Sequence, residues 1–196
     1  YLILHAEALG RLANLLGETA QEERWNSLAK KMLEEMLSKM WNGDRFVSLF
    51  PDSEEPFVTD SLCAYQPLLL GKRLPQDIID KMAADLSVEG DLLTPYGVAS
   101  ERLSSPYVDI LTGWADGPIV APMQLQMVVG LYECGKEALS KEIANRYCTA
   151  LAKHGFFHIY NPYTGLGMNK GRDGVLHQHW SSWCSSIFLL LADRYC

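Results

Sequence analysis

Apolar residues at helical spacing constrain the fold of this chain more than any other feature of its sequence. Residues 1–16 place Leu4, Ala8, Leu12 and Leu15 on one face, and this spacing is typical of an amphipathic helix. Similar segments follow along most of the chain, and no alternating run is long enough for a major β-sheet. The pattern predicts an all-α fold of helical hairpins, with short turns on one side and long loops on the other.

Two of the predicted helices carry further expectations. Thr19 and Glu22 have the spacing of a capping box at the start of the second helix. The last helix is apolar on nearly every side, which predicts a central, buried position. A stripe of large side chains in the second helix is predicted to pack in the core: Trp25, Leu28, Met32, Met36 and Met40. The predicted helices span about residues 1–16, 19–40, 60–69, 75–86, 119–133, 136–154 and 180–195.

Length and charge limit the class of protein. The 196 residues fit one domain, and the formal net charge of −7 argues against nucleic acid or an anionic membrane surface as a partner. No apolar run is long enough to span a bilayer.

The five cysteines show no CxxC pairing, which favours a reducing compartment, and we expect the cytoplasm. The chain opens within a helix, which suggests a portion of a longer domain.

Two long connections stand apart from the helices. Residues 89–118 are rich in Gly, Pro and aromatic residues, and residues 155–183 combine aromatic residues with three of the five His. Loops held by a rigid helical scaffold are where binding and catalytic residues concentrate. We therefore expect the functional site in these two segments.

Several short motifs in these segments are specific when taken together. In order along the chain they read LLTPYGVASE, SPY, GPIVAP, GLYECG, YNPYTGLG and HWSSWCSSIFLLLAD. This order and spacing resemble the C-terminal half of the six-hairpin α/α-toroid glycosidases, a group that includes processing α-glucosidase, mannosylglycerate hydrolase and trehalase-like enzymes. The resemblance covers nearly the whole chain and implies a toroid, here a partial one, with a sugar pocket at one end.

The resemblance also implies an inverting mechanism with two carboxylic acids, one that protonates the leaving oxygen and one that activates a water. The general acid of the family lies upstream of the part matched here. The base of the family is a Glu just before the Tyr/Phe-Asn segment, and His158 stands at that position. The family usually reads Trp-Arg-Gly-Pro-Ile-Trp-Ala-Pro where this chain reads ADGPIVAP, so Asp116 replaces an Arg.

Three residues are candidates for acid–base chemistry, each with a structural alternative. His158 is predicted either to act as a base, because neutral imidazole accepts a proton near pH 7, or to be a hydrogen-bonded loop residue. Asp116 is predicted to replace the missing base or to bind a substrate hydroxyl. The structural alternative is that it caps a turn before Gly117-Pro118. Glu101 matches a pocket-rim position, with a solvated loop charge as the alternative.

Aromatic rings and a possible metal site complete the candidates. Ring faces match the CH face of a pyranose, so the sugar-stacking candidates, with core packing as the alternative, are Tyr96, Trp114, Tyr160 and Trp180. Zinc held by His177, His179 and a cysteine is a weak possibility, because an HxH pair alone is a poor zinc signature. The segment TGLG indicates a tight turn rather than a phosphate cradle, so no metal and no cofactor are predicted.

The first functional interpretation is a single glycoside hydrolase-like domain over residues 1–196 that acts on or binds an α-linked glucoside or mannoside. The second is a non-catalytic carbohydrate-binding or structural fragment. The third is a zinc-dependent toroid of the cyclase or prenyltransferase kind. A partial toroid leaves apolar helix faces uncovered, so we expect an open arc covered by a second copy of the chain or by a missing N-terminal segment.

Overall fold

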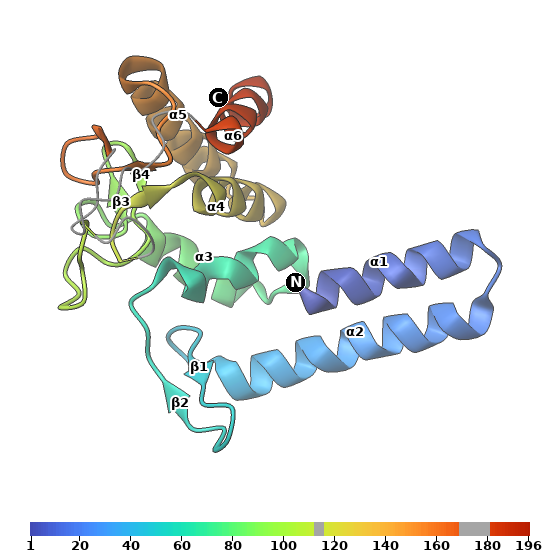
Figure 1. Ribbon diagram of the computed structural model, residues 1–196. Helices are drawn as coiled ribbons and strands as arrows, with labels where there is room; N and C mark the ends of the chain where they lie inside the picture. The colour runs from blue at the N-terminus through green and yellow to red at the C-terminus, as the bar shows by residue number, and fades with distance from the viewer. Residues whose placement is uncertain (112–115, 169–180) are drawn as a thin grey trace. The chain divides into compact units, whose positions relative to one another are not determined.

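The structure is a computed structural model that describes residues 1–111, 116–168 and 181–196. The chain divides into two compact units, Tyr1–Thr59 and Asp60–Cys196. Helices make up most of both units and the strands are two residues long (Figure 1). The predicted all-α class is therefore confirmed.

The first unit is an antiparallel helical hairpin with a small β-ribbon. Helix α1 (Leu2–Leu15) packs along α2 (Thr19–Met40). The turn between them uses Gly17, whose φ of 74° suits glycine. The capping-box prediction is wrong, because Glu18 is the N-cap of α2 and no side chain caps this end. The Glu22 side chain instead accepts a hydrogen bond from Asn14 Nδ2 at 2.8 Å.

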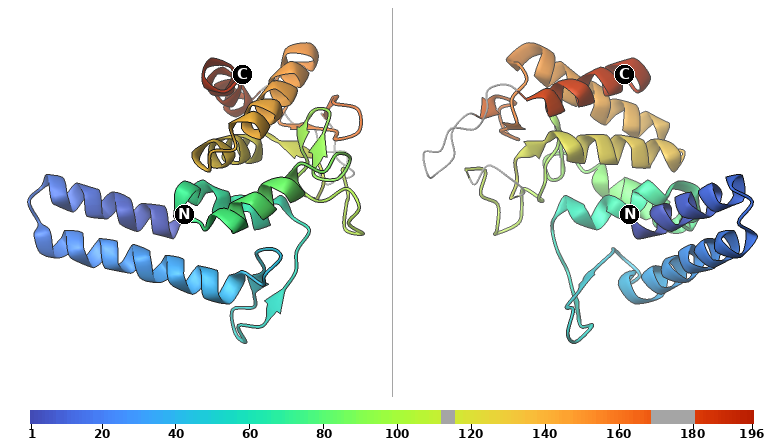
Figure 2. Two further views of the ribbon diagram at one scale, coloured as in Figure 1. Left: turned by 180° about the vertical axis from the view of Figure 1, so that it is seen from behind. Right: turned by 45° about the vertical axis from the view of Figure 1, so that its right-hand side comes forward.

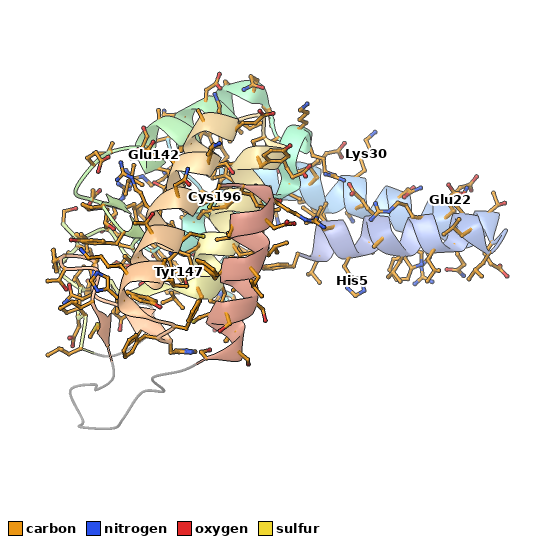
Figure 3. The ribbon with its side chains drawn as sticks, turned by 90° about the horizontal axis from the view of Figure 1, so that it is seen from above. His5, Glu22, Lys30, Glu142, Tyr147 and Cys196 are labelled. Carbon is orange, nitrogen blue, oxygen red and sulfur yellow. The ribbon has the colours of Figure 1, made fainter. Side chains whose placement is uncertain are left out.

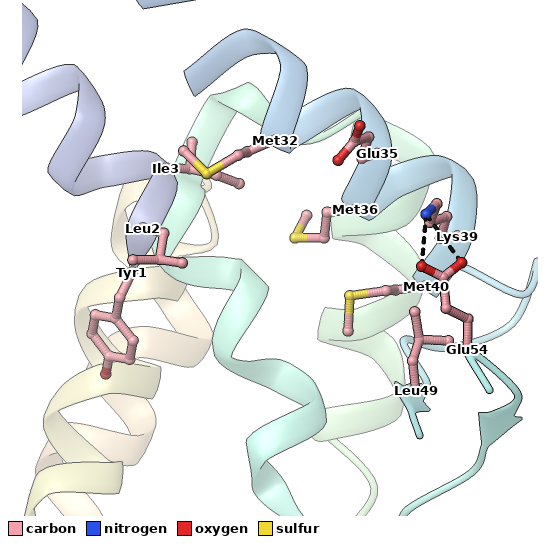
Figure 4. Close-up of a pocket in the computed structure, with 10 residues that line it drawn as sticks. All are labelled: Tyr1, Leu2, Ile3, Met32, Glu35, Met36, Lys39, Met40, Leu49 and Glu54. Carbon is pink, nitrogen blue, oxygen red and sulfur yellow. Dashed lines mark hydrogen bonds and ion pairs between the residues drawn. The ribbon is translucent and has the colours of Figure 1, made fainter. Parts of the chain in front are cut away.

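The predicted core stripe of α2 is also only partly correct. Ala29 is the buried residue of this helix, whereas Leu28 is 39% exposed. The methionines are half-buried, and they line an open apolar pocket of about 390 Å³ whose rim carries the Lys39–Glu54 ion pair at 3.2 Å (Figure 4). Strands β1 (Ser48–Leu49) and β2 (Pro56–Phe57) pair antiparallel beyond the end of α2.

The second unit is built around helix α4 (Ala121–Glu133), which contacts three other helices. These are the 3-10 helix η1 (Leu62–Arg73), α5 (Glu137–His154) and α6 (Ser182–Arg194). Helix α3 (Gln76–Leu86) packs on η1, and Pro75 stands at its start as predicted. A Cβ at Gly130 would lie 3.0 Å from the carbonyl carbon of Leu68. Glycine is required there because the two helices approach so closely. Figure 3 shows α4, α5 and α6 side by side.

The last helix is not the central, buried helix that its sequence predicts. In α6 the buried residues are Cys184, Ile187 and Leu191, whereas Trp183 is 50% and Leu189 67% exposed. A helix that is apolar on all sides can be buried on all sides, but each face becomes buried only where another element packs against it. Within the second unit, α4 and α5 cover one face of α6.

The loops of the second unit gather at one end of its helices, which we call the loop end (Figures 1 and 2). It includes the β3–β4 hairpin (Leu93–Thr94 and Gly97–Val98). It also includes a three-stranded sheet of β5 (Ile119–Val120), β6 (Ile159–Tyr160) and β7 (Gly167–Met168), in that order and antiparallel.

A buried amide joins this hairpin to the helical core. Gln124 of α4 accepts a hydrogen bond from the Val98 N–H at 2.8 Å and donates to the Val98 carbonyl at 2.7 Å. Both residues are 0% exposed. The side chain thus takes the place of a neighbouring strand, and it satisfies backbone groups that water cannot reach.

Replacing this amide tests the contribution of the bond pair to stability. We expect Gln124→Leu to lower the free energy of unfolding by about 2–4 kcal/mol, because it leaves a buried N–H and a buried C=O without partners. Urea denaturation followed by circular dichroism measures this change. Gln126→Leu on the same helix is the control, because Gln126 is half-exposed, and it should cost less than about 1 kcal/mol. Equal losses in both variants would contradict the assignment.

Candidate functional site

Glu101 is the buried carboxyl group among the described residues of the loop end. Its residue is 8% exposed, and its carboxylate accepts a hydrogen bond from Ser105 Oγ at 2.9 Å. Its backbone bridges to Ser61 at the start of η1. Burial raises the pKa of the Glu101 carboxyl, the negative charges of Asp60 and Asp116 raise it further, and the Ser105 hydrogen bond lowers it. The solvated loop charge considered from the sequence does not describe this group.

Arg102 belongs to a network of ion pairs that includes Asp60, whose carboxylate lies 3.8 Å from Arg102 Nε. The Arg102 side chain is 11% exposed, and its guanidinium contacts Asp91 at 2.7 Å, together with Asp85 and the Tyr65 hydroxyl. Burial would raise the pKa of Asp91, but hydrogen bonds from Arg102 and Ser104 outweigh it and hold that pKa below its usual value. This network ties the segment after Glu101 to η1 and α3.

Asp116 lies close to Glu101 through the backbone. The N–H of Gly117 donates to Ser100 Oγ at 3.0 Å, and the N–H of Ser100 donates to the Pro118 carbonyl at 3.1 Å. These bonds bring the two loop segments together, and the Asp116 charge acts on Glu101 as described above. Asp116 itself is exposed, and its carbonyl accepts a hydrogen bond from the Asp109 N–H at 2.7 Å.

His158 belongs to a different part of the loop end. Val120 pairs with Ile159 in the β5–β6 register, so His158 lies beside the start of α4, whereas Asp116 lies beyond the other end of the paired segment. The His158 ring is 6.0 Å from the ring of Trp183. The Cys184 thiol donates to the Phe157 carbonyl at 2.9 Å and holds this segment against α6.

The two described aromatic candidates differ in exposure. Tyr96 is half-buried in the turn of the β3–β4 hairpin, and its ring lies so close to Gly165 that a Cβ there would be 2.4 Å from it. Tyr160 is 0% exposed, and its hydroxyl bonds to the Gly155 carbonyl and to the Phe157 N–H. Tyr160 is therefore packed in the core, which is the alternative to sugar stacking that the sequence left open.

Several predicted residues lie outside the part of the chain that the structure describes: Trp114, His177, His179 and Trp180. Among the described residues no group of three or more His, Cys, Asp or Glu is arranged to hold a metal ion. No helix in the described ranges is long and apolar enough to cross a membrane.

Sequence reasoning missed Asp91, Arg102 and Ser105 as partners of this site. Asp91 is separated by 11 residues from Arg102, and the two come together only when the loop folds back. The sequence SERLSS offers a weak signal, because closely spaced Ser and charged residues favour turns that bond their own side chains.

The raised pKa of Glu101 predicts a pH-dependent effect on stability. A carboxyl group with a raised folded-state pKa destabilises the protein when ionised, and this cost is relieved as the pH falls through that pKa toward about 4.3. We expect Glu101→Gln to raise the melting temperature relative to wild type at pH 7.5 and to lose this advantage by about pH 4. Glu137→Gln, at an exposed position in the first turn of α5, should show a difference that is nearly independent of pH. Thermal melts across this pH range decide the matter, and a constant difference for Glu101→Gln would disprove the assignment.

Comparison with solved structures identifies the fold. The GH63 mannosylglycerate hydrolase from Thermus thermophilus, in complex with glucose, matches with a TM-score of 0.74 and 20% identity. The match covers 94% of this chain and 44% of that one, so the chain spans less than half the length of that enzyme. Neutral trehalase Nth1 from Saccharomyces cerevisiae matches with a TM-score of 0.67 and 17% identity, over 88% of this chain and 30% of that one. These matches confirm a partial α/α-toroid of the glycosidase type.

Comparison of sequences gives the family. No curated protein matches the chain. The family described as the mannosylglycerate hydrolase MGH1-like glycoside hydrolase domain matches residues 1–181. The chain therefore belongs to the MGH1-like glycoside hydrolase domain family.

Proposed function

We propose that this chain is the C-terminal portion of a glycoside hydrolase domain that binds an α-linked glucoside or mannoside at the loop end of its second unit. The proposed reaction is hydrolysis with inversion, and Glu101 is one of the two acid–base groups that we propose in this chain. Family membership supports the class of reaction. The T. thermophilus enzyme of similar fold is described in complex with glucose and, in another structure, with Tris and D-glycerate.

The observation that carries the proposal is the burial of Glu101 among the loops. A catalytic acid must hold a proton near the working pH, and burial is the usual way to raise the pKa of a carboxyl group. Burial shifts the pKa of Glu101 in this direction. Its side chain accepts one hydrogen bond from Ser105 Oγ, which orients the carboxyl group.

The second group of the mechanism is proposed from position and charge. Inverting enzymes keep their two carboxyl groups roughly 6.5–9.5 Å apart so that a water fits between sugar and base. Asp116 is our candidate, since it is exposed and its charge acts on Glu101. His158 is the alternative base, because neutral imidazole accepts a proton near pH 7. Tyr96 is proposed as a sugar contact, and Trp114 and Trp180 remain proposals from sequence.

Non-catalytic sugar binding is the second candidate function. It is favoured by the enclosure of Glu101, whose residue is 8% exposed, because a catalytic acid must reach the leaving oxygen. In that case the loop end recognises a sugar, and the carboxyl group serves the loop structure.

Titration calorimetry with a panel of sugars and an assay of product release test the proposal together. The panel is glucose, mannose, maltose, trehalose and mannosylglycerate. We expect the wild type to bind and hydrolyse at least one of them. Glu101→Gln should reduce kcat by about 10²–10⁴-fold, because it removes a proton-transfer group, while binding persists.

The matched control is Glu137→Gln, which changes the same charge at an exposed position on α5 and should leave kcat unchanged. Hydrolysis that survives in Glu101→Gln would rule out Glu101 as the acid–base group. Binding without hydrolysis in the wild type would favour the second candidate function.

A further inference from the structure

The turn that follows Glu101 supplies its hydrogen-bond donor. The Ser105 N–H donates to the Arg102 carbonyl at 2.9 Å and closes the turn. From that position Ser105 Oγ donates to the Glu101 carboxylate at 2.9 Å. Ser105 is 7% exposed, so the donor and the acceptor are both shielded from water. The position of Ser105 therefore depends on the shape of this turn.

Asp91 binds both arms of the same turn. One carboxylate oxygen, Oδ2, contacts Arg102 Nη1 at 2.7 Å. The other, Oδ1, accepts from Ser104 Oγ at 2.9 Å and from the Ser104 N–H at 3.3 Å. Because both oxygens are engaged, one carboxylate fixes the residue just after Glu101 and the residue just before Ser105.

We propose that Asp91 is a positioning residue for Glu101, because it bridges Arg102 and Ser104 and so fixes the turn from which Ser105 donates to Glu101. This assignment rests on the proposed role of Glu101 as the acid–base group. It extends that role, because a carboxylate on a separate loop segment then sets how firmly Glu101 holds its proton and where its carboxyl group points.

The charges around Glu101 show that Asp91 acts through the turn. Asp60 and Asp116 are the charged groups that act on Glu101 directly, and Ser105 is its donor. The Arg102 guanidinium pairs with Asp85 and Asp91, and its Nε lies 3.8 Å from an Asp60 carboxylate oxygen. Loss of the Asp91 charge alone would lower the pKa of Glu101 slightly, whereas loss of the Ser105 hydrogen bond raises that pKa. The two effects have opposite signs and can be separated.

Asp85 provides a matched control for this separation. It engages the same guanidinium from the end of α3, through Nη2 and alongside the Tyr65 hydroxyl. Asp85 contacts the turn through Arg102. No described side-chain contact joins Asp85 to Ser104. Asp85→Asn and Asp91→Asn thus remove the same charge from the same arginine, but Asp91→Asn alone releases Ser104.

The test is a pH titration of the Glu101 side-chain carboxyl carbon by NMR in protein labelled with ¹³C-glutamate, with the signal assigned by its absence in Glu101→Gln. We expect Glu101 to titrate at a higher pH in Asp91→Asn and in Ser105→Ala than in wild type. Asp85→Asn should not raise the titration midpoint. The double variant Asp91→Asn/Ser105→Ala should titrate no higher than Ser105→Ala, because both changes remove the same hydrogen bond.

Ser104→Ala keeps the test valid if Asp91→Asn does not fold, because Ser104 is exposed and its loss removes one bond to Asp91. We expect a shift of the same sign and smaller size. A Glu101 midpoint that stays at or below the wild-type value in Asp91→Asn, or in Ser104→Ala where that is used, would overturn the proposal. Asp91 would then contribute to stability alone.

This titration needs no substrate, so it is independent of the proposed function. If the wild type hydrolyses a sugar, the pH profile of kcat/KM in Asp91→Asn should move in the same direction as the NMR midpoint. If it hydrolyses none of the panel but the midpoint moves as expected, the proposed function fails while the control of Glu101 by Asp91 stands. Hydrolysis together with an unmoved midpoint gives the reverse conclusion.

Discussion

The loop end depends on a simple constraint: part of its backbone is buried, and buried N–H and C=O groups need partners. Strands of two residues supply few of them, so side chains from the helices supply others. Gln124 bonds both backbone groups of Val98, and Arg146 of α5 donates to the Thr94 carbonyl at 2.8 Å. Ser100 holds Gly117 in the same way. Rigid helices therefore fix the loops, and a site made of loop residues acquires a defined geometry.

The same constraint explains why a carboxyl group is found buried in this region. Glu101 lies in an extended segment bridged to Ser61 and followed by a turn that bonds its own side chains. An isolated buried carboxylate is costly, and it is tolerated only when hydrogen-bonded or protonated. Glu101 has one donor and a raised pKa. That combination marks Glu101 as a candidate functional group.

Local chemistry decided which parts of the fold the sequence could predict. Pro75 marks the start of α3, and Gly135 and Gly155 mark helix ends with φ values of 76° and 92°, because proline and glycine act through their own backbone angles. The exposure of α6 was not predictable, because it depends on elements far away in the sequence. The Asp91–Arg102 contact was not predicted either, because isolated charges in a loop do not reveal their partners.

The register of β5 and β6 bears on how the candidate groups divide the chemistry. Ile119 pairs with Tyr160 and Val120 with Ile159, and a strand rises about 3.3 Å per residue. His158 and Asp116 therefore lie at opposite ends of the paired segment, and one proton acceptor at a single water cannot be made from both. Asp116 shares its end with Glu101, whereas His158 shares its end with Trp183. For the two-group mechanism that we propose, this placement favours Asp116 over His158 as the partner of Glu101.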